Sequence, residues 1–224
     1  MSILPHNVGA IPNPFLVVCE GYGDLRLIDA LLNSNHIANC DVGCPSDRGG
    51  TGSGKSGIAK YLLSVKAVIE KGTANLQGIA VVADANGNAA TSFDAMVLAL
   101  QDAYFESPPT PFTFSAGMPR TGVFLNPGQG MTGCLENLLW DAAVRQNPAL
   151  DQCVTDFFLC TGNQIALAQP NHQAKMRMSA IVAAHCKDNP WASSGLMWSD
   201  PGNPVPITSP RFNDLVDFLQ QFVA

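Results

Sequence analysis

Two short and continuously apolar segments of the chain each end in an acidic residue. FLVVCE covers residues 15–20, and GIAVVADANG covers residues 78–87 and stays apolar up to Asp84. Apolar runs of this length, without alternating polar residues, are typical of strands buried on both faces of a parallel sheet. The two segments therefore constrain the fold to one with a covered parallel sheet, and they place Glu20 and Asp84 at its carboxyl edge.

Helical patterns separate the predicted strands. After residues 15–20, the segment DLRLIDALLNSN repeats Leu and Ile with the 3.6-residue period of a helix. Further strands are predicted over residues 36–43 and 121–127, and further helices from Gly57, over residues 92–103 and over residues 134–144. This alternation predicts an α/β fold with a parallel sheet of about four strands, flanked by helices.

The pattern changes in the last third of the chain, where only helices are predicted. They cover residues 151–160, 171–186 and 209–224, the last with Ser209 as N-cap and Pro210 at its first position. We therefore divide the chain into an extension, an α/β core and a helical C-terminal elaboration packed on the core as one compact unit. These are residues 1–14, 15–145 and 146–224.

Composition excludes two classes of protein. The chain has 224 residues, of which 46% are hydrophobic and 13% charged, so it is not disordered as a whole. With 12 Lys+Arg against 18 Asp+Glu, its formal net charge is −6. A protein that coats nucleic acid without regard to sequence depends on an excess of cations, so that class is not favoured.

We expect a cytoplasmic protein that does not enter a membrane. The first residues do not resemble a secretory signal, and no apolar run approaches the ~20 residues of a membrane helix. The seven cysteines, several in apolar runs, are expected to be reduced and buried. Cys40 and Cys44 have C-x3-C spacing, but no second pair completes a zinc site.

Acidic residues gather at the predicted carboxyl edge of the sheet. Glu20 and Asp84 end strands, Asp24 follows Glu20 by four residues, and Glu136 lies near the start of a helix after the fourth strand. Clustered carboxylates need cations, protons or distance, and Mg²⁺ prefers oxygen ligands. Three of the acids also have a structural explanation: Asp24 as a helix N-cap, Glu136 as a complement to a helix dipole, and Asp84 as a turn former. Glu20 is the hardest to explain in this way, because an acid that ends an apolar strand is expected to be buried or nearly so.

The segments VCEGYGD and VVADANG, with GCLENLLW downstream, resemble the marks of a Toprim domain. Together with the late helix that contains Lys175, they resemble the Toprim half of the OLD-type (overcoming lysogenisation defect) nucleases. The whole chain is similar to a small, uncharacterised bacterial family of stand-alone proteins related to that half. Residues 15–145 would then form a Toprim-like core. OLD-like Toprim domains occur with ABC-type ATPase domains, so the resemblance also implies such a partner.

The resemblance implies Mg²⁺- or Mn²⁺-dependent phosphoryl transfer, with nucleic-acid phosphodiesters as substrates. Glu20 would act as general base or metal ligand, and Lys175 would stabilise charge on the phosphate. Metal ligands would be Asp24, Asp84, Asn86 and Glu136. Asn86 departs from the family pattern because it replaces the second acid of D-x-D. That loss of charge keeps open the alternative of a non-catalytic binding module that works with an ATPase.

Residues 49–56, GGTGSGKS, match the phosphate-binding pattern G-x-x-x-x-G-K-[ST]. In a nucleotide hydrolase of the P-loop class, the loop would cradle phosphates with Gly54, Lys55 and Ser56. An apolar strand should run directly into the first Gly, whereas CPSDR intervenes here. The loop also opens a helix, so it could hold a nucleic-acid phosphate instead. With few cations in total, we expect the chain alone to bind a long polymer weakly.

Overall fold

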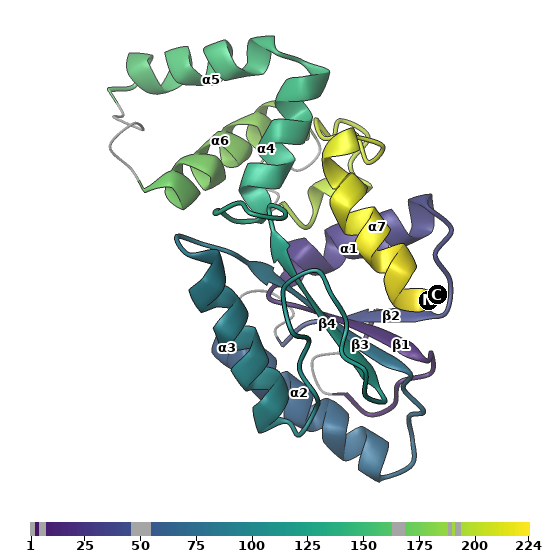
Figure 1. Cartoon of the computed structure of the whole chain (residues 1–224). Coiled ribbons are helices and arrows are strands. Elements are labelled where there is room, and N and C mark those ends of the chain that lie inside the picture. Colours follow the sequence, from purple (N-terminus) through teal and green to yellow (C-terminus); the bar gives the residue numbers. More distant parts are fainter. Residues whose placement is uncertain (1–2, 5–7, 46–54, 163–168, 188–189, 191–193) are drawn as a thin grey trace.

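Four parallel strands form the centre of the protein (Figure 1). The computed structural model describes residues 3–4, 8–45, 55–162, 169–187, 190 and 194–224. The strands are β1 (Phe15–Cys19), β2 (Cys40–Gly43), β3 (Gly78–Asp84) and β4 (Arg120–Asn126). Their order across the sheet is β2-β1-β3-β4, and every neighbouring pair is parallel. The predicted α/β fold with a four-stranded parallel sheet is therefore confirmed.

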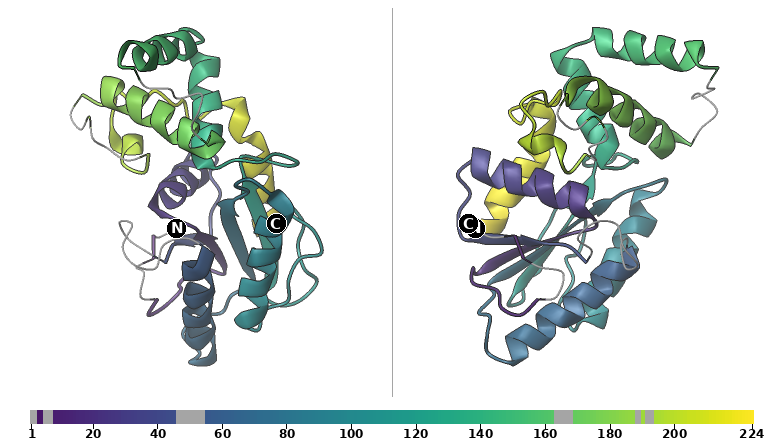
Figure 2. Two further views of the ribbon diagram at one scale, coloured as in Figure 1. Left: turned by 90° about the vertical axis from the view of Figure 1, so that its left-hand side faces the viewer. Right: turned by 180° about the vertical axis from the view of Figure 1, so that it is seen from behind.

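Helices cover both faces of the sheet, which explains why its strands are apolar on both sides. In Figures 1 and 2, α2 and α3 lie on one face, and α1 and α7 lie on the other. The bounds of these helices are α1 Tyr22–Ser34, α2 Lys55–Glu70, α3 Ala89–Asp102 and α7 Asn213–Val223. Each face has its own apolar cluster: Leu16 and Val18 of β1 face α2 and α3, while Val17 and Cys19 face α1.

Three further helices group together at the top of Figure 1, above the end of β4. They are α4 (Leu135–Gln146), α5 (Ala149–Cys160) and α6 (Pro170–His185). The apolar cluster under α1 and α7 continues into them without a break, through Leu138, Phe158 and Met178 among others. The C-terminal helices thus share one core with the sheet. Short 3-10 turns at Met197–Ser199 and Pro210–Phe212 complete the chain before α7.

Some boundaries differ from the sequence predictions. Helix α1 begins at Tyr22 with Gly21 as N-cap, so the prediction of Asp24 as an N-cap is wrong, and Asp24 lies in the first turn. Strand β2 is shorter than residues 36–43, because His36 and Asn39 have positive φ and interrupt an extended chain. Ser209 caps the 3-10 turn Pro210–Phe212, since its hydroxyl accepts a hydrogen bond from the Arg211 N–H, whereas α7 itself begins at Asn213 with Phe212 as N-cap.

The cysteines also differ in part from expectation. All seven are free, and five are buried, but Cys153 and Cys160 are exposed. Both lie on α5, whose buried positions are Leu150, Val154 and Phe158. Those three positions recur every four residues and define the single face that packs on the core, so an apolar sequence around Cys160 did not imply burial. Among the described residues, no helix has the length and apolar character needed to cross a membrane.

Helix α7 packs against the sheet through Phe222, which is fully buried. Its ring lies 5.3 Å from the Phe15 ring and 5.9 Å from the Phe114 ring. The contact needs a strand residue without a side chain, because a Cβ at Gly78 would lie 2.6 Å from the Phe222 ring. The C-terminal helix is therefore part of the sheet's packing.

We predict that Phe222→Ala lowers the free energy of unfolding by about 3–5 kcal/mol, because truncation leaves a cavity among fixed rings. Urea denaturation followed by circular dichroism measures the change. Phe157→Ala is the matched control, since Phe157 is 54% exposed, and it should change stability by less than about 0.5 kcal/mol. Equal effects of the two substitutions would contradict this account of α7.

Candidate functional site

The connections that leave β1 and β3 lead to opposite sides of the sheet, towards β2 and β4. Ligands of open α/β sheets bind at such a switch point, outside the carboxyl ends of the strands. Glu20 follows β1 directly, and Asp84 is the last residue of β3. The Glu20 N–H donates to Val82 O at 3.1 Å, and Glu20 Oε2 accepts a hydrogen bond from the Asp84 N–H at 3.1 Å. The two acids thus stand together at the switch point.

Asp24 approaches the same edge from the first turn of α1. It is only 7% exposed, and its Oδ1 accepts a hydrogen bond from Asn126 Nδ2 at 2.9 Å. Asn126 is the last residue of β4 and pairs in register with Asp84. The Asp24 carboxylate therefore joins α1 to β4 through two residues that are 102 positions apart in the sequence.

Glu136 reaches the site because α4 begins beside Asp84. The Leu135 N–H, the first of the helix, donates to Asp84 Oδ1 at 2.9 Å. An acid is stabilised at a helix N-terminus by the unpaired N–H groups and the helix dipole. Glu136 follows in that first turn and is half-buried. Asp84 and Glu136 therefore share the start of one helix.

The four carboxylates lie close enough to oppose one another's ionisation. Burial raises the pKa of Asp24 well above its usual value, and the charges of Asp84, Glu20 and Glu136 raise it further. Burial, followed by the charges of Glu20 and Glu136, raises the pKa of Asp84 to about 7, although the Leu135 hydrogen bond and Lys175 act in the other direction. The predicted gathering of these acids at one edge is thus what the structure has.

Lys175 supplies a positive charge beside the acids. Helix α6 is fixed to the core by Ala174, Met178, Ile181 and Val182, which leaves Lys175 exposed on its other side. Burial lowers the pKa of Lys175, but attraction by Glu136, Asp84 and Glu20, together with Cys134, outweighs it, and the pKa is raised. A cation held in this way remains protonated at neutral pH.

Asn86 is a further predicted metal ligand whose side chain forms a hydrogen bond within the protein. It has a positive φ of 54° and exchanges backbone hydrogen bonds with Gly133, at 2.6 and 2.7 Å. Its Oδ1 accepts a hydrogen bond from Asn171 Nδ2 of α6 at 2.9 Å. Asn86 therefore ties the loop after β3 to the segment before α4 and to α6, and only one lone pair of its Oδ1 remains for another partner.

The donor set suits a hard cation such as Mg²⁺, since it consists of carboxylate and amide oxygens. Buried carboxylates with raised pKa values are also the groups that a cation would neutralise. Within the described ranges, however, no three His, Cys, Asp or Glu side chains are already arranged as a metal site. The residues fit a cation in chemistry, and binding would require them to close around it.

The phosphate-binding pattern lies mostly outside the described residues, which exclude 46–54 and therefore Gly54. Lys55 is the first residue of α2, and Ser56 is exposed. Strand β2 ends at Gly43, so residues 44–48 separate it from the first glycine of the pattern. A P-loop needs its strand to run straight into that glycine, so a P-loop nucleotide hydrolase gains no support from the fold.

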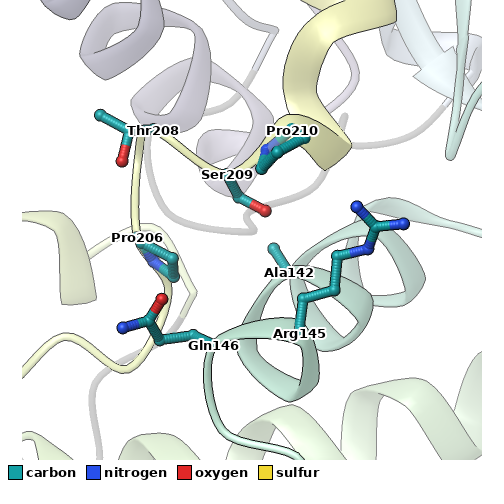
Figure 3. A pocket seen from close by; sticks show the side chains of 7 residues that line it. All are labelled: Ala142, Arg145, Gln146, Pro206, Thr208, Ser209 and Pro210. Atoms are coloured by element: carbon teal, nitrogen blue, oxygen red, sulfur yellow. The ribbon is translucent and has the colours of Figure 1, made fainter.

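A separate cavity of about 370 Å³ lies at the other end of α4 (Figure 3). Its lining residues are Ala142, Arg145, Gln146, Pro206, Thr208, Ser209 and Pro210. At 1.5 Å per helical residue, Arg145 is roughly 14 Å along the axis from Glu136. The cavity is therefore distinct from the acidic edge.

A family model described as "Protein of unknown function (DUF3226)" matches residues 14–224. The chain belongs to the DUF3226 family. The match spans the sheet and the C-terminal helices, so every residue of the acidic edge lies within the DUF3226 region. No curated protein and no solved structure gives a significant match to the chain.

The sequence did not predict two residues of the acidic edge, Asn126 and Asn171. Asn126 had a readable signal, because it ends an apolar strand just as Glu20 and Asp84 do, but it carries no charge. Asn171 had none, since it meets Asn86 across 85 positions of the chain. An amide carries no charge to mark it in the sequence, although its oxygen and N–H groups can form hydrogen bonds at a polar edge.

We predict that metal-free protein loses stability as the pH rises from about 4 to 7 and above. The folded chain keeps protons on Asp84 and Asp24 that the unfolded chain has already released, so stability falls with pH. Melting in EDTA should therefore occur at least roughly 5 °C lower at pH 8 than at pH 5.

Asp84→Asn isolates this effect, because the amide oxygen can still accept from Leu135. It should raise the melting temperature at pH 8 and flatten the pH dependence. Asp102→Asn, at the exposed end of α3, should leave the slope unchanged. If the melting temperature changes with pH by the same amount in wild type and Asp84→Asn, the Asp84 carboxylate does not cause the pH dependence, and the prediction is wrong.

Proposed function

We propose that this protein is a metal-dependent phosphoryl-transfer enzyme and that it cleaves nucleic-acid phosphodiesters. One observation carries the proposal. Four acids from separate segments, Glu20, Asp24, Asp84 and Glu136, converge at the switch point of a parallel sheet, and Lys175 stands beside them. Carboxylates concentrated against their own repulsion are a mark of functional sites.

The resemblance to Toprim domains supports the same conclusion. It rests on a Glu after the first strand and an Asp at the end of the third, and these two residues are neighbours at the sheet edge. Glu136, from the third part of that resemblance, lies within electrostatic reach of both Asp84 and Asp24. Three stretches of sequence that suggested one chemistry therefore meet in one place.

Asp24, Asp84 and Glu136 would hold Mg²⁺ or Mn²⁺, with Glu20 as a further ligand or as the base that accepts a proton from the attacking water. When bound, the ion supplies Lewis-acid activation of the phosphoryl group. Asn86 would contribute an uncharged oxygen while it stays bonded to Asn171. Lys175 would donate to a non-bridging phosphate oxygen and offset its charge.

The charge of the chain limits how it meets a polymer. A net charge of −6 repels phosphates, and the acids at the site add to this repulsion until they are neutralised. We therefore propose that binding of nucleic acid depends on divalent metal, or on a partner such as the ABC-type ATPase that the Toprim resemblance implies.

We predict cleavage of DNA or RNA oligonucleotides, or of the small diester bis-p-nitrophenyl phosphate, with Mn²⁺ or Mg²⁺ and not with EDTA. Glu20→Gln and Asp84→Asn should each reduce the rate by about 10²–10⁴-fold. Lys175→Ala should reduce it by about 10²–10³-fold, because a donor to the developing charge is lost.

The matched control is Lys71→Ala. Lys71 is an exposed cation that follows α2 and lies before β3 begins, at the amino edge of the sheet. It should retain the wild-type rate. Activity that survives Glu20→Gln and Asp84→Asn would come from a contaminant or another site, and would overturn the proposal.

A second candidate is a non-catalytic binding module on the same scaffold. Its support is that Asp84 Oδ1 and Asn86 Oδ1 both accept hydrogen bonds within the protein, from Leu135 and Asn171. Oxygens used in this way hold α4 and α6 in place whether or not an ion is bound. This candidate predicts no metal-dependent cleavage with any substrate, even when a partner ATPase is added.

A further inference from the structure

One side-chain oxygen at the acidic edge has no hydrogen-bond partner among the described residues. Asn126 is 1% exposed, and its Oδ1 is buried without a hydrogen-bond donor in the described part of the chain. The other atom of the same amide is engaged, since Nδ2 donates to Asp24 Oδ1 at 2.9 Å. The unpaired oxygen is therefore covalently held beside one of the four clustered acids.

An unpaired acceptor in a protein interior is unfavourable because it has given up its hydrogen bond to water, and native proteins have few of them. Rotating the amide would not remove the cost. It would place Oδ1 against the Asp24 carboxylate and leave Nδ2 as the orphan. The hydrogen bond between β4 and α1 accounts for the Nδ2 branch of the Asn126 amide. It does not account for the buried oxygen on the other branch, which a smaller residue would not introduce.

Asn126 Oδ1 differs from the other buried unpaired side-chain atoms in the described ranges. These are Arg26 Nε, Tyr61 Oη, Trp198 Nε1 and Arg211 Nε. Each of those four atoms carries a hydrogen to donate, whereas an amide oxygen only accepts. An acceptor-only atom can take either a hydrogen-bond donor or a cation, and the neighbouring acids favour a cation.

We propose that Asn126 belongs to the cation site, where its Nδ2 orients Asp24 and its Oδ1 is an oxygen ligand of the ion. The inference rests on the proposed function and extends it to a residue outside the Toprim-like pattern. The carboxyl end of β4 then contributes an oxygen ligand to the site, as the ends of β1 and β3 do through Glu20 and Asp84. Asn126 also adds a ligand without adding a fifth negative charge to a cluster in which Asp24 and Asp84 already resist ionisation.

The test measures metal binding and does not depend on activity. Mn²⁺ affinity is determined by isothermal titration calorimetry, and Tb³⁺ luminescence lifetimes in H₂O and D₂O count the waters on the bound ion. Asn126→Leu, which keeps the size of the side chain, should weaken Mn²⁺ binding about 10- to 100-fold. It should also add about one water to bound Tb³⁺, because water replaces a lost oxygen ligand.

Asn126→Asp separates the two branches of the amide. It keeps an oxygen at Oδ1 but removes the hydrogen that Nδ2 donates to Asp24. If Oδ1 is a ligand, this variant should bind Mn²⁺ at least as tightly as wild type, with the wild-type water count. Its metal-free form should melt at a lower temperature than wild type, since it adds a carboxylate to the cluster.

Asn13→Leu is the matched control. Asn13 Nδ2 donates to Asp41 Oδ1 at 2.6 Å, so it makes the same kind of amide–carboxylate bond, but Asp41 lies in the first half of β2. This substitution should lower stability and leave both Mn²⁺ affinity and the Tb³⁺ water count unchanged. Loss of metal binding in Asn13→Leu would mean that general destabilisation explains the effect, and would overturn the inference.

The remaining outcomes separate the inference from the proposed function. Wild-type protein that binds neither Mn²⁺ nor Tb³⁺ would overturn the proposed function. Wild-type protein that binds them, with equal affinity and water count in Asn126→Leu, would overturn only the role of Asn126. Loss of binding in both Asn126→Leu and Asn126→Asp would show that the Nδ2 bond to Asp24 matters and that Oδ1 is not a ligand.

Discussion

Repulsion among four carboxylates is the constraint on which the arrangement of this protein depends. Glu20, Asp24, Asp84 and Glu136 stand where apolar strands end, and burial there strengthens the opposition between like charges. The protein limits the repulsion with directed N–H groups: Asp84 N–H reaches Glu20, and Leu135 N–H reaches Asp84. These bonds fix the carboxylates in place without removing their mutual repulsion, and the pKa values of Asp24 and Asp84 stay raised.

The C-terminal helices add groups to the same edge of the sheet. Their contribution is at the edge: α4 presents its N-terminus to Asp84, and α6 brings Lys175 and Asn171 to the same place. One apolar cluster joins these helices to α1 and α7, so the position of Lys175 is coupled to the core of the whole protein.

Amides have a particular part in this site. Asn86, Asn126 and Asn171 supply donors and acceptors between elements where a further acid would raise the repulsion. The resemblance to Toprim domains predicts an acid at position 86. The Asn86 side chain instead accepts a hydrogen bond from Asn171, which ties the loop after β3 to α6. An amide oxygen still binds a hard cation, so a loss of charge at Asn86 is compatible with a metal site that gains an oxygen from Asn126.

The sequence by itself determined the sheet, the order of its elements and the identity of the acids. Short continuous apolar runs that end at turn residues are typical of strands covered on both faces, and strand ends in a parallel sheet share an edge, so Glu20 and Asp84 were predictable neighbours. The start of α1 and the exposure of Cys153 and Cys160 were not, because capping and burial depend on what packs against a helix. Only the tertiary structure decided that Asn126 holds Asp24 and that Asn171 engages Asn86, since those contacts join residues 102 and 85 positions apart and leave no periodic trace in the chain.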